Sequence, residues 1–213
     1  MPRASRPRIR MPVALLSIGA GLALVLGACA GSSFDPTGPC TTDGKVSGAY
    51  PDLEALVPTS YQGSKPGVVD SGRTCTTEGL GSFATHGVKE LRFAGATWET
   101  GTQSGLTLAT FTSVGGPELQ PAWLEEFYET TARTAKNVES LDTSDVALPS
   151  GAAAKRLDVL NGESYQTVVV WDVGDRVAAA LVASFIRDIG SKDAHDQIVG
   201  AAIDTLESSP AGS

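Results

Sequence analysis

The chain has 213 residues, with 16 lysines and arginines against 24 aspartates and glutamates, which gives a net charge of −8 at pH 7. This length suits one domain with short appendages. The acidic balance excludes nucleic-acid binding, which depends on lysine and arginine against phosphates. It also disfavours broad adsorption to anionic lipid headgroups.

The first 28 residues have the layout of an export signal. They contain four arginines and no acidic residue, and an apolar stretch, residues 13–25, follows the arginines. Small residues then lead into a cysteine, in the order Leu26-Gly27-Ala28-Cys29. Without this segment the chain keeps 185 residues, of which 12 are basic and 24 acidic, and its net charge is −12.

The end of this segment, Leu26-Gly27-Ala28-Cys29, resembles a bacterial lipobox. The resemblance implies cleavage before Cys29, a diacylglyceryl thioether on that cysteine, and a protein anchored by lipid on the extracytoplasmic face of the cell membrane. Two acyl chains are enough for stable anchoring. Two alternatives stay open. One is ordinary secretion, and the other is an uncleaved membrane span, for which residues 11–28 are short.

Cysteine usage predicts one disulfide. Three cysteines are present, and the lipid would occupy Cys29. Cys40 and Cys75 remain, an even number in an exported chain. Their bond would close a loop of 35 residues, worth roughly 3–4 kcal/mol in the chain-entropy model. A redox or metal-ligand pair is the alternative, but there is no Cys-x-x-Cys and no histidine near Cys40.

Composition divides the rest of the chain into three parts. Residues 29–49 are rich in turn-forming residues and predict the lipid attachment site and a flexible tether. Residues 50–207 predict a single domain, and residues 208–213 predict a disordered tail. At the start of the domain, the sequence predicts short helices over 51–57 and 76–86 and a short strand between them.

From residue 88 onward the hydrophobic periodicity is clearer. Apolar residues at three- and four-residue spacing predict a helix over 121–136 and another over 192–206, with Ser191 as the N-cap of the second. Alternation predicts strands, and Asn161-Gly162 predicts a hairpin turn. Residues 168–171 are apolar on both faces, which predicts a central strand. The predicted strands are 88–98, 106–114, 138–146, 153–160, 165–173 and 177–185.

This order predicts an α+β fold, in which helices pack on a mostly antiparallel sheet. The chain resembles the PsbP-like sandwich, a superfamily that includes the extrinsic oxygen-evolving protein of photosystem II and bacterial lipoproteins of the Lpq type. It is a resemblance of element order, and it implies accessory or binding roles more than catalysis. It covers roughly residues 88–207 and rests on the helix start at Pro121-Ala122-Trp123-Leu124, the Ser150-Gly151 turn, the 168–171 strand and the terminal 198–206 helix.

Candidate catalytic groups are few. His86 is placed at a predicted helix end, where capping or surface placement explains it. His195 has Ile198 and Val199 at the helical positions where a metal site needs further ligands. Carboxylates could support acid–base work, but three of them lie near the start of a predicted helix, where a solvated face is the usual explanation. These three are Glu125, Glu126 and Glu129.

The sequence therefore favours a non-enzymatic binding or accessory module, displayed at a membrane by the lipid on Cys29, with no cofactor and no metal. Its partner would be an envelope protein or a small ligand. Two alternatives stay open. An envelope hydrolase acting on glycan or peptide would need two carboxyls within about 10 Å in one cleft. A carrier of an apolar ligand would need a pocket above about 300 Å³ between sheet and helix.

Overall fold

The computed structural model describes residues 34–212. The predicted signal, residues 1–28, and the predicted lipidation site at Cys29 lie outside the described residues. None of the helices within residues 34–212 is long and apolar enough to cross a membrane.

The described residues form one sheet and several helices. The strands are β1 (Gly44–Val46), β2 (Val68–Thr74), β3 (Glu90–Glu99), β4 (Gly105–Val114), β5 (Val138–Ala147), β6 (Ala153–Asn161), β7 (Ser164–Val173) and β8 (Arg176–Phe185). The longer helices are α3 (Pro121–Thr134) and α5 (Lys192–Glu207). The short ones are α1 (Pro51–Glu54), α2 (Thr77–Leu80), the 3-10 helix η1 (Gly81–His86) and α4 (Ile186–Ile189).

In residues 34–212 the eight strands lie in the order β1-β2-β3-β4-β8-β7-β6-β5, and each neighbouring pair is antiparallel. The sheet therefore consists of two meanders, β1 to β4 and β5 to β8, which join where β4 pairs with β8. α3 follows β4 and precedes β5. This helix carries the chain from the middle of the sheet to its far edge.

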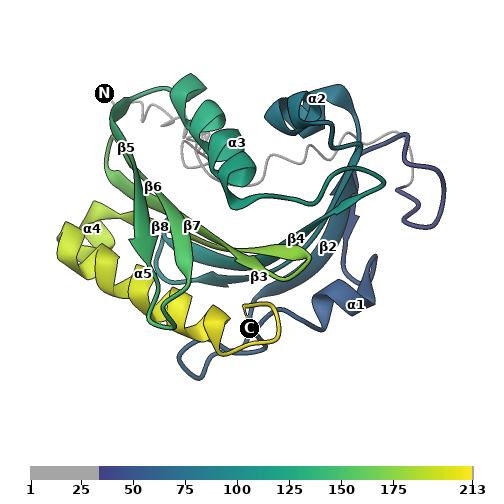
Figure 1. The fold of residues 1–213 in the computed structure, drawn as a ribbon. Helices are drawn as coiled ribbons and strands as arrows, with labels where there is room; N and C mark the ends of the chain where they lie inside the picture. Colours follow the sequence, from purple (N-terminus) through teal and green to yellow (C-terminus); the bar gives the residue numbers. More distant parts are fainter. Residues whose placement is uncertain (1–33, 213) are drawn as a thin grey trace, which may run out of the picture.

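Helices cover both faces of the curved sheet. Figure 1 shows α2 and α3 on one side and α1 and α5 on the other. Phe111 belongs to the core cluster under α3 and η1, and Trp98 to the cluster under α5. Successive side chains of a strand point to opposite faces, so in β7 Val168 and Val170 join the first cluster while Val169 and Trp171 join the second. The prediction that residues 168–171 are covered on both sides is confirmed.

Several predicted elements are confirmed, and each has a local cause. α3 begins at Pro121, whose missing N–H costs nothing at the first helical position. α5 begins after Ser191, whose hydroxyl accepts a hydrogen bond from the N–H of Ala194 at 3.2 Å. The hairpin between β6 and β7 turns at Gly162, with a φ of +58° that glycine adopts without strain.

The predicted fold class is wrong in the balance between helix and sheet. We expected an α+β fold in which helices form the packing layer, but within residues 34–212 only α3 and α5 are longer than six residues. The antiparallel sheet is larger than predicted, because β1 and most of β2 lie in segments whose glycines and polar residues hide the strand pattern. The fold is dominated by its sheet.

The segments that flank the predicted domain also pack against it. The sequence predicts a tether up to residue 49, yet β1 lies in that range and pairs with β2. The predicted tail contains Ala211, which is fully buried, and the indole of Trp171 donates to the carbonyl oxygen of Gly212 at 3.5 Å. These contacts depend on backbone groups and single side chains, so hydrophobic periodicity does not report them.

Candidate functional site

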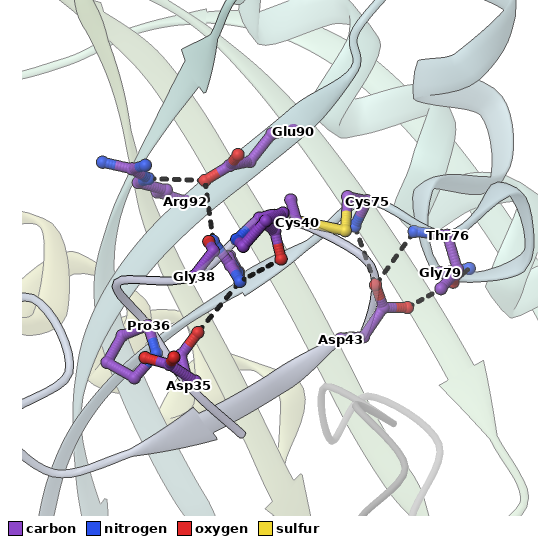
Figure 2. The surroundings of a disulfide bond; sticks show 12 residues. Asp35, Pro36, Gly38, Cys40, Asp43, Cys75, Thr76, Gly79, Glu90 and Arg92 are labelled. Atoms are coloured by element: carbon purple, nitrogen blue, oxygen red, sulfur yellow. Dashed lines mark hydrogen bonds and ion pairs between the residues drawn. A yellow bond between two sulfur atoms is a disulfide. The ribbon is translucent and has the colours of Figure 1, made fainter. Parts of the chain in front are cut away.

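The predicted disulfide between Cys40 and Cys75 is formed, and Figure 2 shows its surroundings. Cys40 precedes β1 and Cys75 directly follows β2, and their Cα atoms are 6.0 Å apart. This bond, Arg73 and Asp43 together form what we call the N-terminal clasp. The clasp holds residues 34–43 against the β1–β2 edge of the sheet.

Arg73 is the charged centre of the clasp. The residue is buried in β2, with 2% of its surface exposed. Its guanidinium donates hydrogen bonds to the carbonyl oxygens of Gly38 and Asp35 at 2.9 Å each and of Pro39 at 3.0 Å. The carboxylate of Glu90 lies 3.9 Å away. A buried cation needs such partners, and the planar fork of arginine serves several acceptors at once.

Asp43 makes the second polar contact of the clasp. Its carboxylate accepts hydrogen bonds from the N–H groups of Cys75 at 2.7 Å and Thr76 at 2.9 Å, and from the Thr76 hydroxyl (Figure 2). Burial alone would raise the pKa of Asp43, but these hydrogen bonds lower it below its ordinary value. The Thr76 hydroxyl also accepts from the N–H of Gly79 at 3.0 Å, so Asp43 ties β1 to the start of α2.

Gly79 makes room for this contact. A Cβ atom at position 79 would overlap Oδ2 of Asp43 and Oγ1 of Thr74. Glycine is therefore required here by the close approach of the aspartate rather than by its backbone angles.

The clasp fixes the point at which the chain enters the domain. Phe34, the first described residue, lies beneath Arg73, whose guanidinium carbon is 5.8 Å from the centre of the ring. Phe34 is five residues after Cys29, and an extended chain spans at most about 3.6 Å per residue. Phe34 therefore lies within about 18 Å of Cys29.

A second polar network surrounds His195 at the start of α5. The imidazole Nδ1 lies 2.8 Å from the hydroxyl of Ser184, and Nε2 lies 2.8 Å from the hydroxyl of Thr167. Thr167 donates to Asp158 at 2.5 Å, because an ionised carboxylate only accepts. Nε2–H therefore donates to Thr167, and Ser184 donates to Nδ1. Burial lowers the pKa of His195 to about 4, so the ring is neutral near pH 7.

Ionic contacts extend this network to the surface. Arg156 pairs with Asp158 at 2.6 Å and with Asp196 at 2.7 Å, and Lys192 also pairs with Asp196 at 2.7 Å. Burial would raise the pKa of Asp158, but Arg156 and Thr167 lower it below its ordinary value. The same balance, with Lys192 and Arg156 as the partners, lowers the pKa of Asp196.

Serine, histidine and aspartate in one hydrogen-bonded chain are also the parts of a nucleophilic site. Here Ser184 is 0% exposed and His195 is 1% exposed, and Thr167 stands between the imidazole and the carboxylate. A nucleophile must reach its substrate, whereas these groups dock α5 on β7 and β8. Sequence reasoning weighed His195 as a metal ligand and missed this network, because its partners lie on strands 28 and 11 residues away.

His86 takes a packing role at the end of η1. Its Nε2 lies 2.7 Å from Oε2 of Glu126, and its ring stacks on Trp123 with the ring centres 4.6 Å apart. The sequence predicts a helix-end position for His86, which the structure confirms. The contact with the start of α3 was missed, because the partners are about 40 residues distant and no local pattern links them.

The three glutamates of α3 serve separate contacts. Glu126 pairs with His86, and Glu129 pairs with Arg133 one turn later at 2.5 Å. Burial raises the pKa of Glu125, and the nearby Lys155 opposes this effect. Within the part of the chain that the structure describes, no three histidine, cysteine, aspartate or glutamate side chains come together in a way that could hold a metal ion.

A small apolar cavity lies between the sheet and the helices α3 and η1. Its volume is about 20 Å³, enough for one water molecule and far below what an apolar carrier would need. The hydroxyl of Tyr128 is buried beside it and has no hydrogen-bond partner among residues 34–212. The lining residues are Thr74, Gly79, Phe83, Leu91, Phe93, Phe111, Leu124, Phe127 and Tyr128.

The two ends of the sheet differ from each other. Strand β5 ends the sheet on one side, and β1, beside the clasp, ends it on the other. Neither a protein-family model nor a curated protein matches this chain. A function is therefore proposed from the lipobox-like sequence, the clasp and the two edges of the sheet.

Proposed function

We propose that this protein is a lipid-anchored extracytoplasmic module that binds an envelope partner. The observation that carries the proposal is the N-terminal clasp, which holds the chain against the sheet at Phe34, five residues after Cys29. Disulfides persist in oxidising compartments outside the cytosol, and the Cys40–Cys75 bond thus supports export by the predicted signal. A lipid on Cys29 would hold the domain close to the membrane surface.

The clasp also gives the anchored domain an orientation. The chain enters at the β1–β2 edge, so this edge is the one that faces the bilayer. β5 lies at the opposite end of the strand order, with neighbouring strands about 4.8 Å apart. The anchored domain would therefore present β5 away from the lipid, toward the envelope.

We propose binding rather than catalysis because the candidate catalytic groups are buried in packing contacts, whereas one edge of the sheet is accessible. The buried groups with catalytic potential, His195 and Ser184, dock α5 on the sheet. The β5 edge, in contrast, is a long accessible surface whose backbone is regularly paired with β6 from Ser140 to Ala147, after an irregularity between Val138 and Ser140. Such an edge suits the recognition of another chain.

The anchor is tested by the mass of the protein purified from the membranes of a bacterium that expresses the full chain. We expect a chain that begins at Cys29 and carries the mass of the lipid, and we expect Cys29→Ala to remove that mass and release the protein from the membrane. The matched control is Cys40→Ala with Cys75→Ala, which should keep the lipid. An unmodified Cys29 in membrane-bound protein would refute the proposal.

A further inference from the structure

The outer edge of β5 is a row of available backbone groups. β5 is ten residues long and is paired only with β6 in the described part of the chain. Outside its pairing with β6, no backbone hydrogen bond within residues 34–212 reaches this strand between Val138 and Ala147. An unpaired strand of this length is a template for the addition of another strand.

β5 is fixed by its contacts with β6 and with the core, while its outer edge is open. Val138 and Leu141 pack against the core under α3, and Val146 packs against the core under α5. These contacts and nine paired positions with β6 fix the register of β5. A preformed edge loses little conformational freedom when a partner binds. The exposed residues of the strand are Glu139, Ser140, Asp142, Thr143, Ser144, Asp145 and Ala147.

Charge indicates what kind of strand fits this edge. Asp145 pairs with Lys155 at 2.5 Å but remains 80% exposed, and Glu139 and Asp142 form no ion pair within residues 34–212. Asp142 also lies opposite Asp158 on β6. A second copy of this chain would bring the same acidic strand to the edge, and like charges would repel.

We propose that the outer edge of β5 binds an extended, basic segment of a partner protein, which pairs with β5 as an additional strand. Asp142 and Asp145 are three positions apart and face opposite sides of the sheet, so the segment would carry lysine or arginine at two positions three residues apart. This inference rests on the proposed binding function and names the surface and the partner chemistry.

The test uses the full chain, purified in detergent from membranes, and a short peptide of threonine and valine with two lysines three residues apart. We expect the labelled peptide to bind, as measured by fluorescence anisotropy, and to slow amide hydrogen exchange in residues 138–147. Asp142→Asn with Asp145→Asn should weaken binding about fivefold. Asp52→Asn with Asp175→Asn makes the same change in net charge elsewhere and should leave binding unchanged.

Backbone pairing is tested by methylating alternate amides of the peptide. A strand has two edges, so methylation along the edge that meets β5 should abolish binding, and methylation along the other edge should have little effect. Equal effects of both peptides, or no slowing of exchange in β5, would overturn the proposal. Slowing that depends on the concentration of the protein alone would assign the edge to a second copy and overturn it as well.

The same sample separates this inference from the anchor. Its intact mass reports whether Cys29 carries lipid. A lipidated protein that does not bind the peptide contradicts the β5 inference alone, and peptide binding by a protein with an unmodified Cys29 contradicts the anchor alone.

Discussion

The two edges of the sheet end in different ways. The β1 edge has three residues of strand, and beside it the clasp ties the entering chain to β2 with a disulfide, a buried arginine and a partly buried aspartate. The β5 edge has ten residues of strand, of which seven are exposed and three are acidic. Sheets normally shorten, cover or charge their edges to prevent unwanted pairing. This molecule keeps one edge short and fastens the chain beside it with covalent and polar contacts. The other edge is long, carries acidic side chains and has an irregularity between Val138 and Ser140, and it suits a chain of opposite charge.

The largest expected effect comes from removing the charge at the centre of the clasp. Arg73→Ala should lower the free energy of unfolding by about 3–5 kcal/mol, because it leaves three carbonyl oxygens without their buried donor and removes one of the two cations beside Glu90. The matched control is Arg92→Ala. Arg92 contacts the same Glu90 at 2.6 Å but is partly exposed, so its loss should cost about 1 kcal/mol. Equal costs in urea unfolding would show that burial of Arg73 is not what matters.

Opening the disulfide should affect one edge and spare the other. Cys40→Ala with Cys75→Ala should cost roughly 3–4 kcal/mol, because the unfolded chain regains the freedom of the loop between them. Amide exchange should then accelerate in residues 34–46 and remain unchanged in residues 138–147. Acceleration of similar size in both regions would mean that the clasp stabilises the whole sheet rather than its own edge.

Acid should weaken the half of the molecule that contains β5 before it weakens the clasp. The folded pKa of His195 is about 4, lowered by burial from its ordinary 6.5. As pH falls below 6.5, His195 becomes protonated in the unfolded chain but stays neutral in the folded chain. The free energy of unfolding therefore decreases progressively from pH 6.5 down to about pH 4. The loss amounts to about 3 kcal/mol.

This pH dependence is measured by urea unfolding at several pH values and by the titration of the His195 ring in NMR spectra. His195→Gln should flatten the loss between pH 6.5 and 4. The pKa of Asp43 is lowered, so this carboxylate takes up a proton at a lower pH than an ordinary aspartate does. The clasp should therefore keep its stability to a lower pH than the His195 network. A His195 ring that titrates near pH 6.5 in the folded protein would contradict the assignment.

The smallest expected effect comes from adding a methyl group at Gly79, where the clasp leaves no room for a side chain. Gly79→Ala should cost about 1–3 kcal/mol, because its Cβ would overlap the Asp43 carboxylate and force α2 away from β1. Gly200→Ala is the control. Gly200 lies within α5 with open space around it, and alanine there should stabilise the protein by about 1 kcal/mol. Thermal unfolding should shift in opposite directions for the two variants, and a shift in the same direction would refute the steric argument.

The sequence predicted the parts of the molecule whose signals are local. Periodicity located α3 and α5, and Asn161-Gly162 located a hairpin turn, because each depends on residues a few positions apart. The disulfide was predictable because only two cysteines remain after Cys29. The dominance of the sheet over the helices was not predictable, because β1 and β2 contain glycine and polar residues whose strand character comes from their neighbours in the sheet.

The polar contacts were beyond the reach of sequence patterns for a related reason. Arg73 has its acceptors 34 to 38 residues earlier in the chain, and they are backbone carbonyls, which every residue carries. His195 meets Thr167 and Ser184 only after β7, β8 and α5 pack together. The β5 strand was predicted nearly at its observed limits, but its place at the edge of the sheet depends on topology, which single-strand patterns do not specify.

The division of the sheet into two meanders has a consequence for the order of folding. Within residues 34–212, β4 with β8 is the one strand pair whose members are not consecutive in the chain. If the chain crosses a membrane from its N-terminus, β1 to β4 and both bridged cysteines emerge before β5. The first meander can then pair locally and close its disulfide while the rest is still in transit. We expect the arrival of β8, followed by α5, to be the slow final step, because β8 covers the open side of β4 and α5 completes the core on one face.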